Sequence, residues 1–236
     1  MLIKALQLDQ AAVIGDIHGR LDLLELLLDQ VQGRPLVSVG DICDRGADSS
    51  SCVDLLVREE AHGVRGNHEQ WLIDWCQGKG LDKMALHHRM GGRATLLSYG
   101  VDPDSPAVDG AHTAVPSYHK RWLSALPYVL DLEVDGQDYW VIHAGIPGVF
   151  SFNGLLPEEV VPHLVENHPE SLLWTKTQPD MMPWVDRPVI IGHVPQREPF
   201  DDGRIIAVDT GAGRWSDGGL TAVLLPEREF VTVYAD

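Results

Sequence analysis

Six short apolar runs, each followed at once by a polar residue, constrain the fold of this chain more than any other feature. They are rich in β-branched residues, and four of them end in glycine. The runs cover residues 11–15, 36–40, 63–66, 139–142, 189–192 and 205–208. Runs this short and this apolar are typical of strands that are buried on both faces of a sheet.

Helical patterns separate the first runs. Residues 21–28 and 52–57 place apolar side chains at helical spacing, so the chain alternates strand and helix. This alternation predicts βαβ units, in which ligands bind beyond the C-terminal ends of the strands. The residues expected at those ends are Asp16, Asp41, Asn67, His143 and His193.

Two later segments depart from this alternation. Residues 78–126 contain a Gly-Gly pair and three prolines, and they predict a helical excursion over the sheet, with one helix over 84–99. Residues 220–225 and 230–234 flank a polar turn and predict a β-hairpin. We therefore expect a mixed sheet, or two packed sheets, in a single α/β domain that takes up residues 1–236.

The composition of the chain limits the kinds of partner that it can bind and the compartment in which it works. The chain has 18 Lys plus Arg against 35 Asp plus Glu, so its formal charge is 18 − 35 = −17. This charge argues against nucleic acid or an anionic membrane as the main partner.

No apolar run approaches the roughly 18 residues of a membrane helix, and the first ten residues do not predict a signal peptide. Three cysteines without a C-x-x-C pair favour a reducing cytoplasm. The oligomeric state cannot be read from the sequence.

The first two motifs carry carboxylates directly after strands. In residues 15–19 (GDIHG), Asp16 and His18 are two positions apart and can reach one ion from an extended segment. In residues 40–46 (GDICDRG), Asp41 stands where a carboxylate could bridge two cations. Each motif also has a plainer interpretation, namely an Asp turn with a surface histidine and an ordinary surface ion pair.

The third motif is residues 65–69 (RGNHE). The Asn67 side-chain oxygen suits a divalent cation, whereas His68 points elsewhere and is free for proton transfer. Asn67 could instead cap the helix that follows. His143 and His193 each follow an apolar run, and either one alone would usually be a hydrogen-bonded core residue.

The combination is far more specific than its parts. Oxygen and nitrogen donors without thiolates suit two divalent ions such as manganese, iron or zinc. The six candidate ligands are Asp16, His18, Asp41, Asn67, His143 and His193. Two such ions, together with Arg45 and Arg65, would give an acidic protein a cationic pocket for phosphate.

Residues 15–19, 40–46 and 66–69 resemble the signature motifs of the phosphoprotein phosphatases, a branch of the calcineurin-like metallophosphoesterases, with the closest likeness to small bacterial and phage members. Further matches, in the same order, are residues 143–145, 192–193 and 209–211. The resemblance spans almost the whole chain and implies a sandwich of two packed mixed β-sheets flanked by helices.

The resemblance also implies roles for the site residues. It assigns one cation to Asp16, His18 and His193 and the other to Asn67 and His143, with Asp41 shared by both. His68 would be the general acid, oriented by Asp44. Arg45 and Arg65 would hold the phosphoryl oxygens. Lys176 stands where relatives often carry an arginine, which leaves its contact with phosphate open.

The implied activity is hydrolysis of a phosphomonoester by a water that two divalent ions, manganese first, share and activate. The substrate would be a phosphoprotein or a small phosphoester, and Asp44, Arg65 and Glu69 follow the pattern of the serine/threonine protein phosphatases. The alternatives are a symmetrical dinucleoside tetraphosphate hydrolase, a broad phosphoesterase, and a metal-binding scaffold without catalysis.

Overall fold

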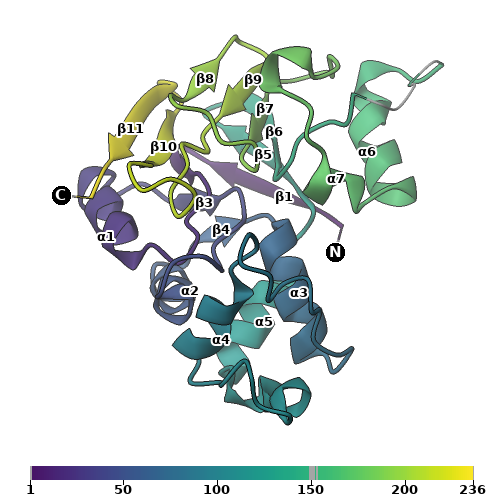
Figure 1. Ribbon diagram of the computed structural model, residues 1–236. Helices are drawn as coiled ribbons and strands as arrows, with labels where there is room; N and C mark the ends of the chain where they lie inside the picture. Colours follow the sequence, from purple (N-terminus) through teal and green to yellow (C-terminus); the bar gives the residue numbers. More distant parts are fainter. Residues whose placement is uncertain (1, 149–151, 153, 236) are drawn as a thin grey trace.

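A computed structural model describes residues 2–148, 152 and 154–235, and its strands form two sheets (Figure 1). The first sheet has the order β1 (Ile3–Leu8), β5 (Val129–Val134), β6 (Gln137–Ile142), β7 (Val189–Ile191), β9 (Ile205–Ala207) and β8 (Phe200–Asp201). The second has the order β11 (Glu229–Val233), β10 (Leu220–Leu225), β2 (Ala11–Ile14), β3 (Leu36–Ser38) and β4 (His62–Gly63). Both sheets mix parallel and antiparallel pairs, as predicted.

The two sheets pack face to face, and β2 explains why its sequence is apolar throughout. Successive side chains of a strand point to opposite faces. Ala11 and Val13 pack between the sheets, whereas Ala12 and Ile14 pack against the helices outside. All four are fully buried. Burial on both faces therefore removes the polar alternation that a half-exposed strand would show.

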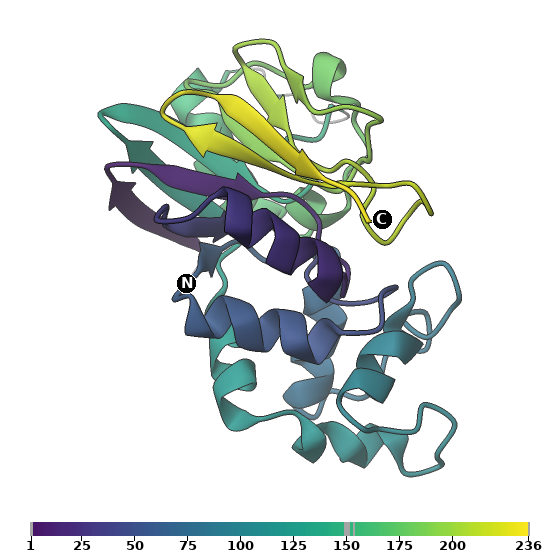
Figure 2. The ribbon, with the colours of Figure 1, turned by 90° about the vertical axis from the view of Figure 1, so that its left-hand side faces the viewer.

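Helices cover both outer faces and complete a four-layer arrangement (Figure 1), and Figure 2 faces the helices outside the second sheet. The second sheet is covered by α1 (Leu21–Gln30), α2 (Ser49–Arg58) and α3 (Asn67–Cys76). The first sheet is covered by α6 (Pro157–Asn167) and α7 (Ser171–Trp174). Within the described part of the chain, no helix is both long and apolar enough to cross a membrane.

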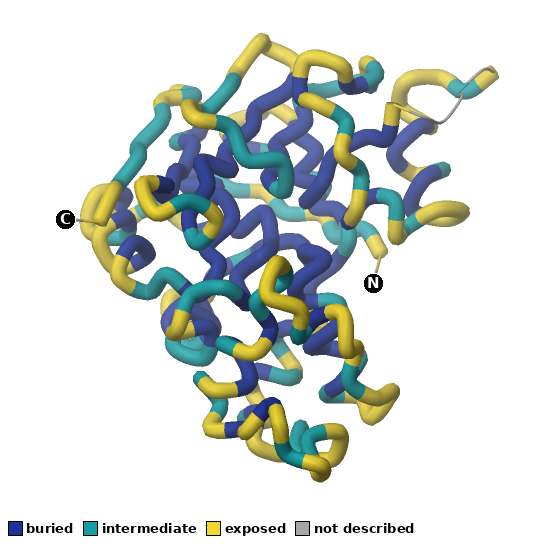
Figure 3. Tube along the Cα trace, viewed as in Figure 1, coloured by how far each residue is buried: buried dark blue, intermediate teal, exposed yellow. Residues whose placement is uncertain are grey.

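The excursion at residues 78–126 differs from the prediction in two ways. It extends the helical layer beside α2 and α3 rather than lying over the sheet, through α4 (Gly92–Ser98), the 3₁₀ helix η1 (Val108–Ala114) and α5 (Ser117–Ala125). The helix predicted over 84–99 begins only at Gly92, because Gly91 adopts a left-handed conformation (φ 86°). The turns before it are largely exposed (Figure 3).

The structure contains the predicted hairpin and a strand at each apolar run, together with three strands that were not predicted. The C-terminal hairpin is present as the antiparallel pair β10–β11. All six apolar runs contain a strand or lead out of one. The sequence analysis missed β1, β5 and β8, of which β1 forms one edge of its sheet and alternates partly buried with exposed residues.

Candidate active site

The site lies where strands of both sheets end side by side. The second sheet supplies the residues that follow β2, β3 and β4, and the first sheet supplies those that follow β6, β7 and β9. In that order they are Asp16, Asp41, Asn67, His143, His193 and Asp209. The sequence analysis placed the first five of these at strand ends but did not include Asp209 in the site.

The backbone is unusual at this place. Among the described residues, eight other than glycine have a positive φ, and five of them belong to the site. Those five are His18 (48°), Asp41 (51°), Asp44 (75°), Arg45 (66°) and His193 (66°). Side chains rarely adopt this conformation, which costs on the order of 1–3 kcal/mol at each position. Strain concentrated in this way is typical of functional sites.

Asp16, His18 and Asp41 form a first cluster of buried donors. His18 Nε2 lies 3.9 Å from a carboxylate oxygen of Asp16 and 3.7 Å from one of Asp41. The other ring nitrogen, Nδ1, donates to the backbone carbonyl of Cys43 at 2.9 Å. This bond fixes the tautomer, so that Nε2 presents its lone pair toward the two carboxylates.

Asp41 also belongs to a second cluster, with Asn67, His143 and His193. His143 Nε2 lies 3.3 Å from Asp41 Oδ1 and 3.1 Å from Asn67 Oδ1, while its Nδ1 donates to the Val39 carbonyl at 2.9 Å. His193 lies within reach of both His143 and Asp41. Burial and the neighbouring His143 lower the pKa of His193 to about 3, so its ring is neutral and can offer a lone pair.

This grouping corrects the assignment of His193. The resemblance placed its side chain with Asp16 and His18, but the structure groups it with Asp41 and His143. Only the backbone N–H of His193 faces Asp16, to whose two oxygens it lies 3.1 Å. The turn after β7 therefore offers its amide to one cluster and its imidazole to the other.

The donor set fits a pair of divalent cations. Burial, together with the carboxylates of Asp209 and Asp41, raises the pKa of Asp16 well above its usual range. Burial raises the pKa of Asp209 to about 6. Buried carboxylates this close disfavour each other's charge, and cations between them relieve that repulsion. Carboxylate, amide and imidazole donors without a thiol are the set that manganese, iron and zinc accept.

His68 stands beside the two clusters and is held by Asp44. Its Nδ1 lies 2.6 Å from Asp44 Oδ2, which also accepts from Trp71 Nε1 at 2.8 Å. The hydroxyl of Thr95, in α4, donates to the other oxygen of Asp44 at 2.6 Å. His68 Nε2 lies 3.4 Å from the Arg45 guanidinium and 3.7 Å from a carboxylate oxygen of Asp41. The imidazole is thus oriented to exchange a proton at Nε2.

The pKa of His68 follows from this environment. Burial lowers it, but the carboxylates of Asp41 and Asp44 outweigh burial and raise it above the usual value. The two carboxylates therefore shift His68 toward its protonated form, which is the direction that a general acid requires. Trp71 and Thr95 give Asp44 its other hydrogen bonds, and sequence reasoning assigned neither of them a role.

Glu69 fastens the loop after β3 to the start of α3. Its buried carboxylate accepts hydrogen bonds of 2.7–3.1 Å from the backbone N–H groups of Asp41, Ile42, Cys43 and Gly66. The approach is so close that a Cβ at Gly66 would lie 2.2 Å from Asp41 Oδ1. Glu69 therefore acts on the site through the position of Asp41.

Of the two arginines expected to hold phosphate, one lines the pocket over the site and the other does not. Arg45 lines a cavity of about 590 Å³ over the site, together with His68, His193 and Lys176. Arg65 does not line it; its guanidinium donates to Gln70 Oε1 and to the carbonyls of residues 124 and 126. The structure thus brings together every sequence-predicted site residue except Arg65, and it adds Lys176 to the pocket wall.

Comparison with known proteins identifies the family. The sequence model of the calcineurin-like phosphoesterases matches residues 10–217, which is most of the chain. The chain belongs to this family. It is therefore an enzyme that hydrolyses phosphoesters, as the motifs indicated.

Relatives of two kinds, by name, are similar to this member of the calcineurin-like phosphoesterase family. Serine/threonine-protein phosphatase 1 of Salmonella typhimurium is 32% identical over 139 residues, which are 57% of this chain and 58% of that protein. The asymmetrical bis(5'-nucleosyl)-tetraphosphatase PrpE of Oceanobacillus iheyensis is 28% identical over 243 residues, covering 94% of this chain and 90% of that protein. The tetraphosphatase alternative in the sequence analysis was the symmetrical type, whereas this relative is named asymmetrical.

Solved structures confirm the fold. The crystal structure of a putative diadenosine tetraphosphatase superposes with a TM-score of 0.66 at 21% identity, covering 100% of this chain and 98% of that chain. A protein serine/threonine phosphatase of Saccharomyces cerevisiae superposes with a TM-score of 0.57 at 16% identity, covering 100% and 83%. At these identities the likeness concerns the sandwich alone.

Proposed function

We propose that this phosphoesterase hydrolyses phosphomonoesters, with phosphoserine and phosphothreonine side chains of proteins as its first substrates. One observation carries the proposal: His68, oriented by Asp44, lines the pocket between Arg45 and Asp41, the carboxylate that both groups of candidate metal ligands share. A general acid is most valuable for an ester whose leaving group is an alkoxide, as in phosphoserine.

Two cations would be held by separate clusters that share Asp41. Asp16 and His18 would complete one site, and Asn67, His143 and His193 the other. When bound, the ions would supply positive charge for the phosphoryl oxygens and lower the pKa of a coordinated water. Manganese is our first choice among the ions that this donor set accepts.

The protein's own groups have distinct parts in the reaction. Arg45 bonds the phosphoryl oxygens and stabilises the charge that develops on them in the transition state. His68 gives its Nε2 proton to the leaving oxygen, while Asp44 holds Nδ1 and favours the protonated ring. We keep Arg65 as a prediction only, because its terminal nitrogens Nη1 and Nη2 donate to Gln70 and to a backbone carbonyl.

A second candidate is hydrolysis of dinucleoside tetraphosphates. The observation that favours it is coverage, since relatives with this name match 94% of the chain, whereas the serine/threonine phosphatases match 57–58%. Against it, Asp44 and Glu69 are both fully hydrogen-bonded parts of the site and follow the protein-phosphatase pattern.

We also propose a cytoplasmic location, which the free thiols of Cys43, Cys52 and Cys76 support.

The test is a comparison of wild type with His68→Asn, with manganese present. Turnover of a phosphoserine peptide should fall by roughly 10²–10⁴-fold while the bound metal is retained. His163→Asn, a histidine on α6, is the matched control and should keep full activity. Undiminished turnover in His68→Asn, or hydrolysis of diadenosine tetraphosphate but of no phosphopeptide by wild type, would overturn the proposal.

A further inference from the structure

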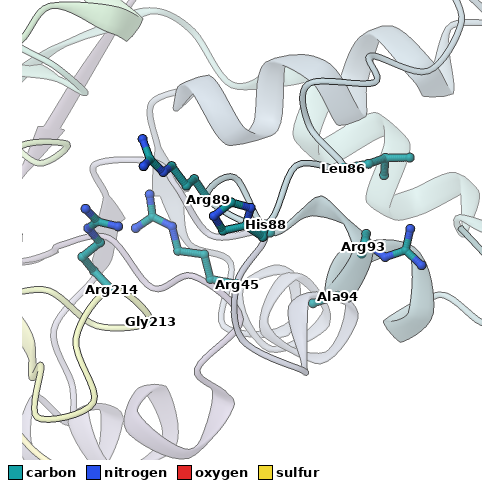
Figure 4. A pocket seen from close by; sticks show the side chains of 9 residues that line it. Arg45, Leu86, His88, Arg89, Arg93, Ala94, Gly213 and Arg214 are labelled. Atoms are coloured by element: carbon teal, nitrogen blue, oxygen red, sulfur yellow. The ribbon is translucent and has the colours of Figure 1, made fainter.

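Three arginines meet at one edge of the active-site pocket: Arg45 after β3, Arg89 before α4 and Arg214 after β9 (Figure 4). The same three line a second cavity of about 580 Å³ beside the pocket over His68. Figure 4 shows their guanidinium groups converging, whereas Arg93 on the same wall points away. The two cavities therefore share one group of positive charges.

Two glycines bring the three arginines together. A Cβ at Gly91 would lie 2.5 Å from the backbone nitrogen of Arg45, and one at Gly213 would lie 3.6 Å from Arg45 Cβ. Both glycines have a positive φ, which other residues rarely adopt. Arg45 is thus packed between two loops, and each loop carries its arginine within two residues of the contact.

Within the described residues, these three guanidiniums form no ion pair with a carboxylate. Of the thirteen arginines in the chain, eight lie within 4.0 Å of a carboxylate in the described structure. The guanidiniums of Arg89 and Arg214 have no such partner in the described part of the chain, and neither has Arg45. Although the chain contains 35 acidic residues, none of the described ones lines either cavity. Three guanidiniums that converge without an ion-pair partner repel one another, and they form a site that an anion stabilises.

We propose that this second cavity is an anion subsite that binds the phosphoryl group next to the one being hydrolysed. The inference rests on the proposed phosphoester hydrolysis and adds a further substrate class to the phosphoproteins, namely compounds that contain a polyphosphate chain. Neighbouring phosphoryl groups of such a chain share a bridging oxygen. They can therefore occupy two cavities that have Arg45 in common, since one guanidinium carries five donors. A phosphopeptide carries its next anion on a separate residue.

The experiment compares wild type with the double variant Arg89→Gln/Arg214→Gln. Inorganic tripolyphosphate provides a chain, p-nitrophenyl phosphate a single phosphoryl group, and a doubly phosphorylated peptide two separate ones. The double variant should lower the ratio of kcat/KM for tripolyphosphate over p-nitrophenyl phosphate by roughly 10–100-fold. Arg93→Gln is the matched control, because Arg93 lines the same cavity but is paired with Asp104, and its ratio should not change.

A binding measurement tests the anion subsite independently of the proposed catalytic function. Calorimetric titration of the His68→Asn protein, at fixed free manganese, should show that the two arginine substitutions weaken tripolyphosphate much more than orthophosphate. If wild type hydrolyses nothing, the proposed function fails while this titration still tests the subsite. Equal losses for both anions, no loss for either, or a loss confined to the doubly phosphorylated peptide would each overturn the subsite.

Discussion

Replacing Asp44 with Asn removes one charge from the site while keeping its hydrogen bonds. Asp44 Oδ2 accepts from His68 and Trp71, and Oδ1 accepts from the Thr95 hydroxyl. An Asn oxygen in the Oδ2 position retains the first two bonds. The Asn amide then faces a hydroxyl that can accept as well as donate. Because every buried partner remains satisfied, we expect the variant to fold and to bind metal as wild type does.

The loss of the charge should appear in the proton transfer. A hydrogen bond to a charged group contributes about 1.5–3 kcal/mol and a neutral one about 0.5–1.5 kcal/mol, so about 1–2 kcal/mol is lost. This corresponds to a fall in kcat of roughly 5–30-fold when leaving-group protonation limits the rate. The Asp44 carboxylate also raises the pKa of His68. Without it the pKa falls, and the loss of activity at high pH should begin at a lower pH.

The assay uses two substrates that differ in their need for an acid. Phenyl phosphate has a poor leaving group and should show the full loss, whereas p-nitrophenyl phosphate has a good one and should show much less. The matched control is Asp54→Asn, a carboxylate that accepts from Tyr118 on the surface, which should behave as wild type. Equal losses on the two substrates would refute the reasoning, because Asp44 would then act on something other than the leaving group.

Three further predictions concern metal, stability and pH. Asp41→Asn should remove bound metal, since both clusters contain this carboxylate, and retention of two ions per chain in a metal analysis would contradict that. Glu69→Gln should lower the free energy of unfolding by about 2–4 kcal/mol, measured in urea, because its amide group cannot accept from the N–H groups that the carboxylate now binds. Burial lowers the pKa of His119, so its contribution to stability is complete above the unfolded value of about 6.5 and declines as the pH falls below it. His119→Gln should therefore flatten the decline in unfolding free energy between pH 7 and 5, and parallel curves for the two proteins would exclude this cause.

Much of the sandwich could be predicted because its central strands are short, apolar and closed by polar residues. The runs at residues 11–15 and 189–192 both contain strands, β2 and β7, with site residues beyond them. β1 escaped prediction because it is an edge strand whose partly exposed side chains break the apolar run. The prediction of a helix before Gly92 was wrong, because apolar spacing does not reveal that Gly91 has a left-handed conformation.

The sequence could not predict the direction in which a side chain points, nor contacts between residues that are far apart in the chain. A motif gives the identity of His193 but not the way its ring turns at the end of β7, so its cluster was misassigned. Arg65 follows a strand end as expected, yet its side chain turns to Gln70. Thr95 reaches Asp44 across 51 positions of sequence, and only the packing of α4 against α2 makes that contact possible.

Anomalous diffraction from crystals grown with manganese tests the central claim most directly. We predict two neighbouring peaks with Asp41 between them, one beside His18 and the other beside His143 and His193. The second peak should disappear in crystals of His143→Ala, while the first remains. A single peak in the wild-type protein, or manganese bound away from these side chains, would contradict the account.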